Sequence, residues 1–567
     1  MRRVPLLRML VLAAALALPL ALDGASGSRG EPALVAVQLL AINDFHGNLE
    51  PPSGANGQMN STPAGGAEYL ATHLASAIAD NPNSIVVAAG DLIGASPLIS
   101  SLFHDEPTIE AMNAMNLAVS SVGNHEFDKG VGELLRMKRG GCHPADGCQG
   151  GGEFKGAAFQ YLSANVVRQA THATLFPATA VRTVGGVRVG FIGETLKGTP
   201  RIVSAAAIRG LTFLDEAIVA NESAARLERQ GVHAIVLLVH EGGRQRPAEG
   251  DSDPNECVNF GGAIESVVGK LTANIPVVIS GHTHTFYNCR IGDHLVTSAG
   301  AYGQMITRIN LEIDRSTGRI ARASAANEIV TRDVARDPAV TSIIEKYGAL
   351  AEGTANRVVG AVVGDIRRSA NAAGESPLGD IIADAQLAAT SAAANGAAVV
   401  AFTNEGGIRS DIVAGAGPLP ARDGRVAEVT YGDLFRVQPF GNVLTVFTMT
   451  GDMIKRLLEQ QFDNPRPGAA SVLQVSSGFT YRYRLKAPAG QHVERNSIAI
   501  AGRRIGPADR VRVAAVNFLV DGGGGYPALG QGTGKIVGVP DIDALVAYFK
   551  GHSPVAPGRQ DRIIRIN

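Results

Sequence analysis

Five short segments in the first half of the chain carry side chains that bind metal ions. Their aspartate, histidine and asparagine residues are hard or borderline ligands, and each segment follows an apolar run. Alternate residues of an extended segment point the same way, so Asp44 and His46 can converge on one ion. His282 and His284 can do the same, although a loop could aim them at two ions. Asp91 follows a glycine that lets the chain turn, and its two carboxylate oxygens can bridge two cations. The segments are residues 43–47, 90–91, 123–128, 239–241 and 281–284.

Each segment alone is a weak signal, because isolated polar pairs are usually ordinary surface features. Together, in this order at strand ends of one predicted domain, they make ordinary surface polarity an improbable explanation and favour metal binding. Asn124 offers a carbonyl oxygen, and the adjacent His125 would lie beside the metals, where it could contact a substrate or protonate a leaving group. Asp128 can reach the His125 ring if the segment turns helically, and would then orient it and stabilise its charge. We expect Glu126 and Glu241 to face away or to cap backbone groups.

The elements that must position these segments alternate between strands and helices. Apolar runs at residues 35–42, 84–90, 187–193, 234–240 and 275–281 predict buried strands, with helices at 67–79 and 107–116 between them. This pattern predicts a layered α/β domain over residues 33–334. Residues 335–356 are predicted to form a linker helix that starts at an aspartate cap followed by proline. A second α/β domain is predicted over residues 357–567, with one of its strands at 510–520.

Length and composition indicate a multidomain globular protein that is exported. A chain of 567 residues exceeds one hydrophobic core, and its net charge of -1 gives no sign of nucleic-acid binding. Residues 1–27 combine a basic start, an apolar run and small residues, which is typical of a secretory signal peptide. An uncleaved membrane anchor is the alternative. We expect a periplasmic or secreted protein with no membrane span after cleavage.

The four cysteines favour two disulfides in an exported chain. We predict that Cys142 pairs with Cys148 in a glycine-rich loop and that Cys257 pairs with Cys289. A zinc site that uses His143 is the alternative for the first pair, but two cysteines and one exposed histidine leave a tetrahedral site incomplete.

The motifs GD, GNHE and GHTH, preceded by D-x-H, resemble those of the calcineurin-like metallophosphoesterases. The second half adds NEGGIR at 404–409, PFGN at 439–442 and NFL at 517–519, which resemble motifs of the 5'-nucleotidase branch. The resemblance covers nearly the whole mature chain. It implies a four-layer α/β/β/α catalytic domain and a C-terminal α/β substrate-binding domain of the 5'-nucleotidase type.

The resemblance also implies two divalent metal ions, which could be zinc, manganese, cobalt or iron. The two ligand sets would share one bridging carboxylate: the first is Asp44, His46, Asp91 and His284, and the second is Asp91, Asn124, His240 and His282. Two such ions can hold a bridging hydroxide and polarise the phosphoryl oxygens. His125 and Asp128 would form the catalytic dyad.

By the same resemblance, the second domain would bind a nucleotide substrate. Phe440 and Phe518 would stack on the base, although core packing is the alternative for a single phenylalanine. Arg409 would contact the sugar or phosphate, and Asn404 and Asn442 the base or neighbouring groups. Because metals and base would be held by different domains, the cleft is expected to close around the substrate, with a hinge near the linker helix.

Two positions depart from the family pattern. Gly524 stands where the family commonly has an aspartate that grips the ribose hydroxyls. Gly374 stands near a position where compared members have an arginine, and Arg367 and Arg368 lie further back. Several activities therefore stay open: hydrolysis of 5'-nucleotides, of 2',3'-cyclic nucleotides or of UDP-sugars, and a thiosulfohydrolase-like reaction. A catalytically silent binding protein is the non-enzymatic alternative, against which the complete set of ligand residues argues.

Overall fold

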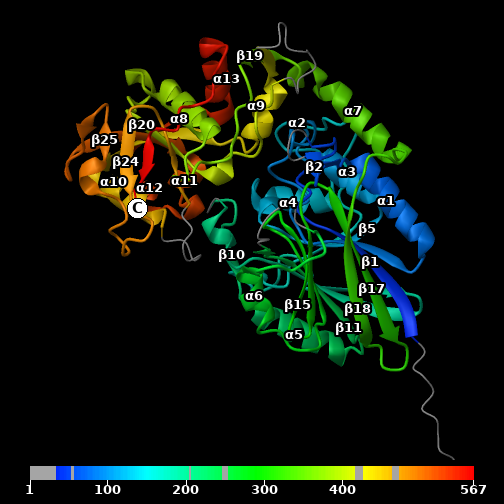
Figure 1. Ribbon diagram of the computed structural model, residues 1–567. Coiled ribbons are helices and arrows are strands. Elements are labelled where there is room, and N and C mark those ends of the chain that lie inside the picture. Colours follow the sequence, from blue (N-terminus) through cyan, green and yellow to red (C-terminus); the bar gives the residue numbers. More distant parts are fainter. Residues whose placement is uncertain are drawn as a thin grey trace, which may run out of the picture.

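The computed structural model describes residues 34–52, 57–203, 206–245, 253–414, 426–462 and 471–566. The predicted signal peptide lies outside these residues. Figure 1 shows two α/β parts, one for each half of the chain, connected by helix α7. Across the described ranges, no helix has the length and apolar character needed to span a membrane.

The first sheet of the N-terminal half has six strands in the order β18-β17-β1-β4-β5-β6. Strands β1, β4, β5 and β6 run parallel, so their carboxyl ends meet at one edge of the sheet. Strand β17 joins β1 antiparallel and pairs with β18 on its other side. The bounds are β1 Leu34–Ile42, β4 Ser84–Ala88, β5 Leu117–Ser121, β6 Gln160–Leu162, β17 Met305–Asp314 and β18 Ile320–Ile329.

The second sheet also has six strands, in the order β15-β16-β14-β11-β9-β8. Its central strands β9, β11, β14 and β16 are parallel, which again brings their carboxyl ends together. The bounds are β8 Thr179–Val184, β9 Val187–Thr195, β11 Ala234–His240, β14 Val277–Ser280, β15 Phe286–Ile291 and β16 His294–Ala299. All five strands predicted for this half are therefore present.

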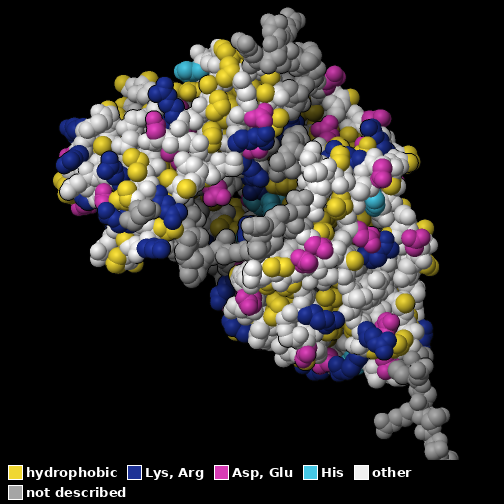
Figure 2. Space-filling model, in the orientation of Figure 1, with side chains coloured by type: hydrophobic (Ala, Val, Ile, Leu, Met, Phe, Trp, Pro, Cys, Tyr) yellow, Lys and Arg dark blue, Asp and Glu magenta, His cyan; other side chains and the backbone are white. Residues whose placement is uncertain are grey.

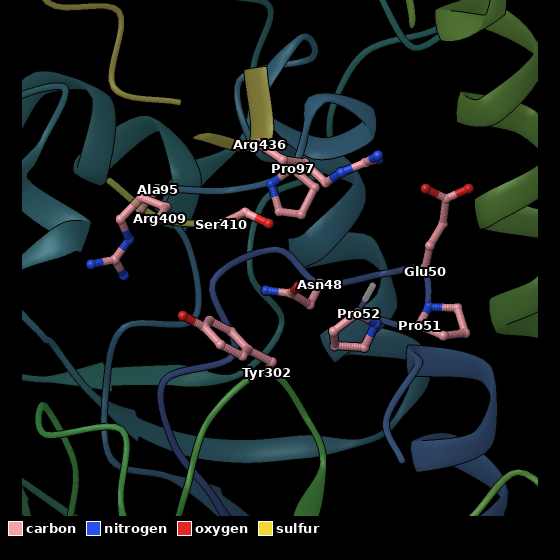
Figure 3. A pocket seen from close by; sticks show the side chains of 10 residues that line it. All are labelled: Asn48, Glu50, Pro51, Pro52, Ala95, Pro97, Tyr302, Arg409, Ser410 and Arg436. Atoms are coloured by element: carbon pink, nitrogen blue, oxygen red, sulfur yellow. The ribbon is translucent and has the colours of Figure 1, made fainter. Parts of the chain in front are cut away.

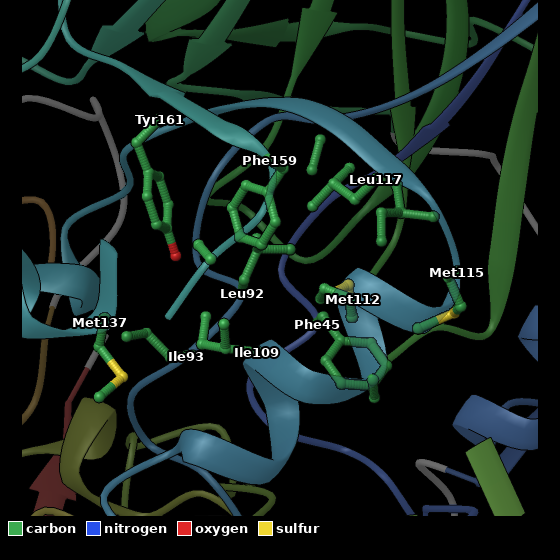
Figure 4. Packing of buried hydrophobic residues seen from close by; sticks show 14 of the residues in the cluster. Phe45, Leu92, Ile93, Ile109, Met112, Met115, Leu117, Met137, Phe159 and Tyr161 are labelled. Atoms are coloured by element: carbon green, nitrogen blue, oxygen red, sulfur yellow. The ribbon is translucent and has the colours of Figure 1, made fainter. Parts of the chain in front are cut away.

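The two sheets pack face to face, and helices cover their outer faces. Valine, leucine and phenylalanine side chains of both sheets, such as Leu39, Phe191 and Val236, form the core between them. A second core lies under α1 (Ala67–Asp80) and α3 (Glu106–Ala114); Figure 4 shows part of it around Phe45 and Phe159. A third core lies under α5 (Glu216–Arg229) and α6 (Ala263–Val268). The predicted four-layer α/β/β/α arrangement is confirmed, and it explains why strands such as β1 are apolar on both faces.

Helix α7 (Pro338–Ala355) connects the halves. Its start follows the prediction: the Asp337 carboxylate accepts hydrogen bonds from the Ala339 and Val340 amides, and Pro338 takes the first helical position. The helix packs on α1, α2 (Leu98–Ser101) and α3 of the first half and on α9 (Tyr431–Val437) of the second. The domain boundaries on either side of it stay a prediction.

The C-terminal half is a second α/β unit. It holds a five-stranded sheet in the order β23-β20-β27-β22-β28 and a four-stranded sheet in the order β26-β25-β24-β29. The strands are β20 Val400–Thr403, β22 Val443–Thr450, β23 Gln474–Val475, β24 Phe479–Tyr483, β25 Ala499–Ile500, β26 Arg503–Arg504, β27 Arg510–Val516, β28 Thr533–Pro540 and β29 Ile563–Arg565. Helices α8 (Pro377–Thr390), α10 (Gly451–Gln460) and α13 (Asp541–His552) complete it, together with the pair β19 (Val358–Val362) and β21 (Ala427–Thr430).

Two local predictions had different outcomes. The strand predicted over residues 510–520 ends at Val516, because residues Asn517–Val520 form the short helix α11, so Phe518 lies on a helix. Both predicted disulfides are confirmed, Cys142 with Cys148 and Cys257 with Cys289. The zinc site built on the first cysteine pair is thereby ruled out.

Candidate active site

Seven predicted ligand residues converge where the carboxyl ends of the two sheets meet. One group joins the His46 and His284 Nε2 atoms, 3.0 Å apart, with Asp44 Oδ1 3.5 Å from His284 Nε2. In the other group, His240 Nε2 lies 2.9 Å from Asp91 Oδ2. His282 Nδ1 lies 3.0 Å from Asn124 Oδ1. The ligand atoms of Asp44, His46 and His284, and likewise those of Asp91, His240 and His282, lie within 4.8 Å of one another.

The histidines are held with one ring nitrogen aimed into this cluster. His46 Nδ1 lies 2.8 Å from the Gly94 carbonyl oxygen and His240 Nδ1 lies 2.7 Å from that of Ala89. A carbonyl oxygen only accepts, so each Nδ1 carries a proton and each Nε2 points into the cluster. The His46 ring, whose pKa burial lowers, keeps its lone pair on Nε2. Among the described residues, the buried His240 Nε2 has no hydrogen-bond partner, although Asp91 Oδ2 is 2.9 Å away. This donor set fits divalent cations.

The backbone that aims these side chains differs from the extended one expected. Asp44, His46, Asp91, His282 and His284 all have left-handed backbone, with φ of 50°, 49°, 49°, 71° and 53°. The extended backbone predicted for these pairs is therefore wrong. Asp44 and His46 still join one group, whereas His282 and His284 join different groups, as the alternative of a loop that aims them at two ions predicts. The chain leaves each strand in a left-handed turn, which costs conformational energy and is typical of functional sites.

Close backbone packing around Asp91 requires glycine at position 123. A Cβ atom on Gly123 would lie 2.1 Å from Asp91 Oδ1, far inside contact distance. Glu126 binds the same turn, as its carboxylate accepts hydrogen bonds from the amides of Asp91 (2.9 Å), Leu92 (2.7 Å) and Gly123 (2.6 Å). The expected capping role of Glu126 is confirmed, and burial with the nearby Asp91 charge raises its pKa to about 7.

His125 and Asp128 lie beside the cluster on one helical turn. A 3₁₀ helix over His125–Phe127 brings His125 Nδ1 to 2.7 Å from Asp128 Oδ2, and the His125 amide donates to Asp91 Oδ1 at 2.8 Å. Burial lowers the His125 pKa, but the Asp128 and Asp91 carboxylates outweigh it and the pKa is raised. This imidazole therefore holds its proton to higher pH than a free histidine.

Burial also shifts the pKa values of the candidate metal ligands. Desolvation raises the Asp44 pKa to about 7, against the opposing effect of His240. Desolvation lowers the pKa of His46 and His284 well below the usual value, which keeps both rings neutral. At Asp91, burial is outweighed by the His240 and His125 imidazoles, so its pKa lies well below the ordinary one. A neutral imidazole and an ionised carboxylate are the forms that bind metal, and the shifts at His46, His284 and Asp91 favour them. Asp44 and His240 differ: at His240 the Asp91 and Asp44 carboxylates outweigh burial and raise the pKa to about 10, so a metal ion must displace a proton from this ring.

A cavity of about 610 Å³ opens from this cluster toward the C-terminal half. Figure 2 shows the hollow between the halves, with basic and histidine side chains visible inside it. Its volume is in the range of small-molecule sites. Side chains of both halves line it, including the dyad and all five predicted substrate-binding residues: His125, Asp128, Asn404, Arg409, Phe440, Asn442 and Phe518.

Phe440 and Arg409 of the second half reach the catalytic groups of the first. The Phe440 ring stacks on His125, with centroids 5.7 Å apart and planes at 20°, and Arg409 Cζ lies 5.7 Å from the Phe440 centroid. Arg409 also lines a smaller cavity with Asn48 and Tyr302 (Figure 3). Its Nη2 is buried with no hydrogen-bond partner in the described chain, so this guanidinium is available to an anion.

Sequence reasoning missed two residues that line the large cavity. Lys129 directly follows the dyad, and its Nζ donates to the Phe440 carbonyl oxygen at 3.2 Å across the two halves. Asp541 is 2% exposed at the start of α13, where Asn442 Nδ2 donates to it at 3.4 Å. The position of Lys129 beside Asp128 could have drawn attention to it. Nothing in the sequence around Asp541 distinguishes it from an ordinary first residue of a helix.

The two departures from the family pattern occupy tight turns. Gly374 and Gly524 have φ of 81° and 71°, and a Cβ would lie 2.6 Å from Val472 Cγ2 and 3.1 Å from Leu519 Cδ2, respectively. A side chain at either position would strain the backbone. Arg367, which lies seven residues before Gly374, is paired with Asp365 and Asp411 of its own half.

Comparison with known proteins agrees with this geometry. Residues 37–286 match the calcineurin-like phosphoesterase family, and residues 353–531 match the C-terminal domain of 5'-nucleotidases. The chain is 32% identical to the endonuclease YhcR of Bacillus subtilis over 93% of this chain and 41% of that protein. It is 33% identical to the cell wall protein Lmo0130 of Listeria monocytogenes over 91% of this chain and 67% of that protein. It thus spans less than half the length of the endonuclease.

Among solved structures, a 5'-nucleotidase precursor from Thermus thermophilus superposes with a TM-score of 0.75 at 25% identity, covering 94% of this chain and all of the other. Fold and matched families together define a metal-dependent phosphoric ester hydrolase. The chain belongs to the 5'-nucleotidase family of calcineurin-like metallophosphoesterases. Enzymes of this class use divalent metals, for which this chain has grouped aspartate and histidine ligands.

Proposed function

We propose that the protein is an exported hydrolase that releases phosphate from nucleoside 5'-monophosphates with two divalent metal ions. The observation that carries this proposal is the single cavity lined by ligand residues, the His125–Asp128 pair and two phenylalanines of the other half. A phosphate at the ligand cluster leaves room for a nucleoside to extend toward Phe440 and Phe518.

The metals would be held by the two ligand sets that the sequence indicates. Asp44, His46, Asp91 and His284 would bind one ion, and Asp91, Asn124, His240 and His282 the other. When bound, the ions supply the positive charge that draws in the phosphate and activates water near neutral pH. Asp91 suits the bridging position, because it lies between His46 (3.7 Å) and His240 (2.9 Å) and its low pKa keeps it ionised.

His125 would donate a proton to the departing nucleoside oxygen. Asp128 holds its Nδ1–H, so Nε2 is the nitrogen left to face the substrate. The Asp128 carboxylate, 2.7 Å from Nδ1, stabilises the protonated ring that such a general acid needs. Its amide bond to Asp91 keeps the ring at a fixed position relative to the ligand cluster.

The second half would bind the nucleoside and shield the reaction from water. Phe440 and Phe518 would stack on the base, a contact that tolerates different bases. Arg409 would pair with the phosphate, since its Nη2 is buried without a partner among the described residues. Asn404 and Asn442 would contact the base or its neighbours. Asp541 adds a buried carboxylate beside Asn442 that could accept from a base amino group.

Secretion or a periplasmic location is part of the proposal. It rests on the signal-like residues 1–27 and on the two disulfides, which persist in oxidising compartments.

The test is phosphate release by the purified mature protein, stripped with chelator and reloaded with Mn²⁺, Zn²⁺ or Co²⁺. AMP is expected to be hydrolysed with the highest kcat/KM, ahead of UDP-glucose, 2',3'-cyclic AMP and bis-p-nitrophenyl phosphate. A faster rate on one of the last three would replace the substrate assignment. Release from none of them with any metal would favour a silent binding protein.

A further inference from the structure

A second cluster of metal-binding side chains lies away from the active site. His104 follows α2, whereas His143 and Asp146 lie in the loop closed by the Cys142–Cys148 disulfide. His104 Nε2 is 2.8 Å from Asp146 Oδ2, and His143 Nδ1 is 3.2 Å from the same oxygen. The two imidazoles stack with centroids 3.7 Å apart and planes at 11°. One carboxylate oxygen therefore has two ring nitrogens beside it.

The cluster shares a feature with the active-site ligands. His104 Nε2 is buried, yet within the described chain it completes no hydrogen bond, although Asp146 Oδ2 is only 2.8 Å away. His240 Nε2 and Asp91 Oδ2 show the same relation at 2.9 Å. At His104 a ring nitrogen and a carboxylate oxygen thus approach closely with no hydrogen bond formed between them. Such an arrangement suits a cation that both atoms can bind.

The ligand chemistry points to zinc. His143 Nδ1 accepts the Asp146 amide proton at 3.2 Å, so this nitrogen is unprotonated, and a bound cation would take its lone pair from the exposed Asp146 amide. Two imidazole nitrogens and a carboxylate oxygen are a usual zinc set, at about 2.0–2.2 Å from the ion. Glu133 of α4 (Val131–Arg139) can complete it, because ligand atoms of His104, Glu133 and His143 lie within 4.8 Å of one another. Arg136 holds the Glu133 carboxylate in place with bonds of 2.9 and 2.7 Å.

We propose that His104, His143 and Asp146, with Glu133, bind one zinc-type divalent cation that is separate from the catalytic metals. The cation would fasten the disulfide loop to the segment between α2 and α3. The chain just after that loop packs on the linker helix, because a Cβ on Gly150 would lie 2.4 Å from Tyr347 Oη. His104 and His143 lie 39 positions apart in the sequence. They supply the nitrogen ligands of this site, and the two cysteines, which form a disulfide, take no part in it.

The test counts zinc bound per chain by elemental analysis after loading the whole protein and desalting it. His104→Ala/His143→Ala is expected to retain one zinc fewer than the wild type, with AMP hydrolysis within about twofold. His172→Ala removes an exposed histidine elsewhere in the same half and is expected to retain the full count. Equal zinc counts in all three proteins would overturn the proposal.

A second measurement separates this site from the catalytic one. In an Asp91→Asn background, added zinc is still expected to raise the melting temperature, and adding Asp146→Asn should abolish that shift. Asp146 is exposed, so its replacement leaves folding intact if the double histidine variant does not fold. If zinc still raised the melting temperature of the Asp146→Asn variant in this background, the proposal would also be overturned. The zinc count and the melting temperature do not depend on activity, so these two readouts test the proposal independently of the nucleotidase assignment.

Discussion

At the scale of single residues, the site is organised around Asp91. Its amide donates to Glu126, Oδ1 accepts from the His125 amide, and Oδ2 approaches His240. Gly123 leaves the space that this carboxylate occupies. One aspartate thus connects the ligand cluster, the dyad and the turn that holds both. Substitutions around it should separate metal binding from proton transfer.

Asp91→Ala and His125→Ala are expected to fail in different ways. Asp91→Ala removes the carboxylate that we propose bridges the two ions, so bound metal and activity should both be lost. His125→Ala leaves the ligand atoms in place, so metal content should stay at the wild-type level while kcat falls by about 10²–10⁴-fold. Elemental analysis beside steady-state kinetics measures both quantities. Equal loss of metal in the two variants would contradict the roles given to them.

Gly123→Ala is expected to lose metal without removing any ligand. Its Cβ would lie 2.1 Å from Asp91 Oδ1, so the carboxylate must move away from the cluster. Metal affinity measured by chelator competition should fall at least tenfold, as is usual when groups that orient ligands are disturbed. Gly132→Ala is the matched control, because its Cβ meets no atom within 4 Å on helix α4. Unchanged affinity in Gly123→Ala would show that the turn can relax.

At the scale of elements, apolar runs identified the strands because parallel strands buried on both faces consist almost entirely of apolar residues. The ligand residues were also predictable, since aspartate, histidine and asparagine directly after such runs have no core role. The left-handed backbone at these residues could not be predicted from the sequence, because φ at Asp44 or His282 depends on contacts with other strands. Phe518 was assigned to a strand because VNFLV is as apolar as a strand, yet α11 begins at Asn517. Lys129 and Asp541 reach the cavity only through the packing of distant segments.

Helix α7 allows a test of one element by itself. Asp337→Ala removes the carboxylate that accepts from two amides of its first turn, and should lower the free energy of unfolding by about 0.5–2 kcal/mol. Glu345→Ala, at an exposed position of the same helix, is the control and should change it by less than about 0.5 kcal/mol. Chemical denaturation of the metal-loaded proteins measures both. An Asp337→Ala variant as stable as the control would mean that packing alone fixes the start of the helix.

At the scale of the whole molecule, a buried carboxylic acid in the N-terminal half affects how the free energy of unfolding depends on pH. Glu194, at the end of β9, is 0% exposed, and neither carboxylate oxygen has a partner among the described residues. Burial, together with Glu216 and Asp215, raises its pKa well above the usual value. The folded protein therefore keeps this proton at pH values where the unfolded chain has lost it.

It follows that Glu194 should make stability fall as pH rises. Above the unfolded pKa of about 4.3 the native state binds more protons, so the free energy of unfolding decreases by up to about 1.4 kcal/mol per pH unit until the folded pKa is reached. Glu194→Gln should flatten this slope between pH 5 and 8 relative to the wild type, whereas the exposed Glu222→Gln should keep it. Denaturation at a series of pH values measures the difference. Parallel curves for wild type and Glu194→Gln would show that the native carboxyl is ionised.

The candidate ligands come from both sheets of the sandwich: Asp44, Asp91 and Asn124 follow strands of one, and His240, His282 and His284 end or follow strands of the other. Cations bound there would crosslink the two sheets. The sheets could separate during unfolding only after the ions had dissociated. Each tenfold rise in free metal above the dissociation constant would then add about 1.4 kcal/mol against unfolding. The supply of free metal would thus govern how long the protein resists proteases that attack its unfolded state.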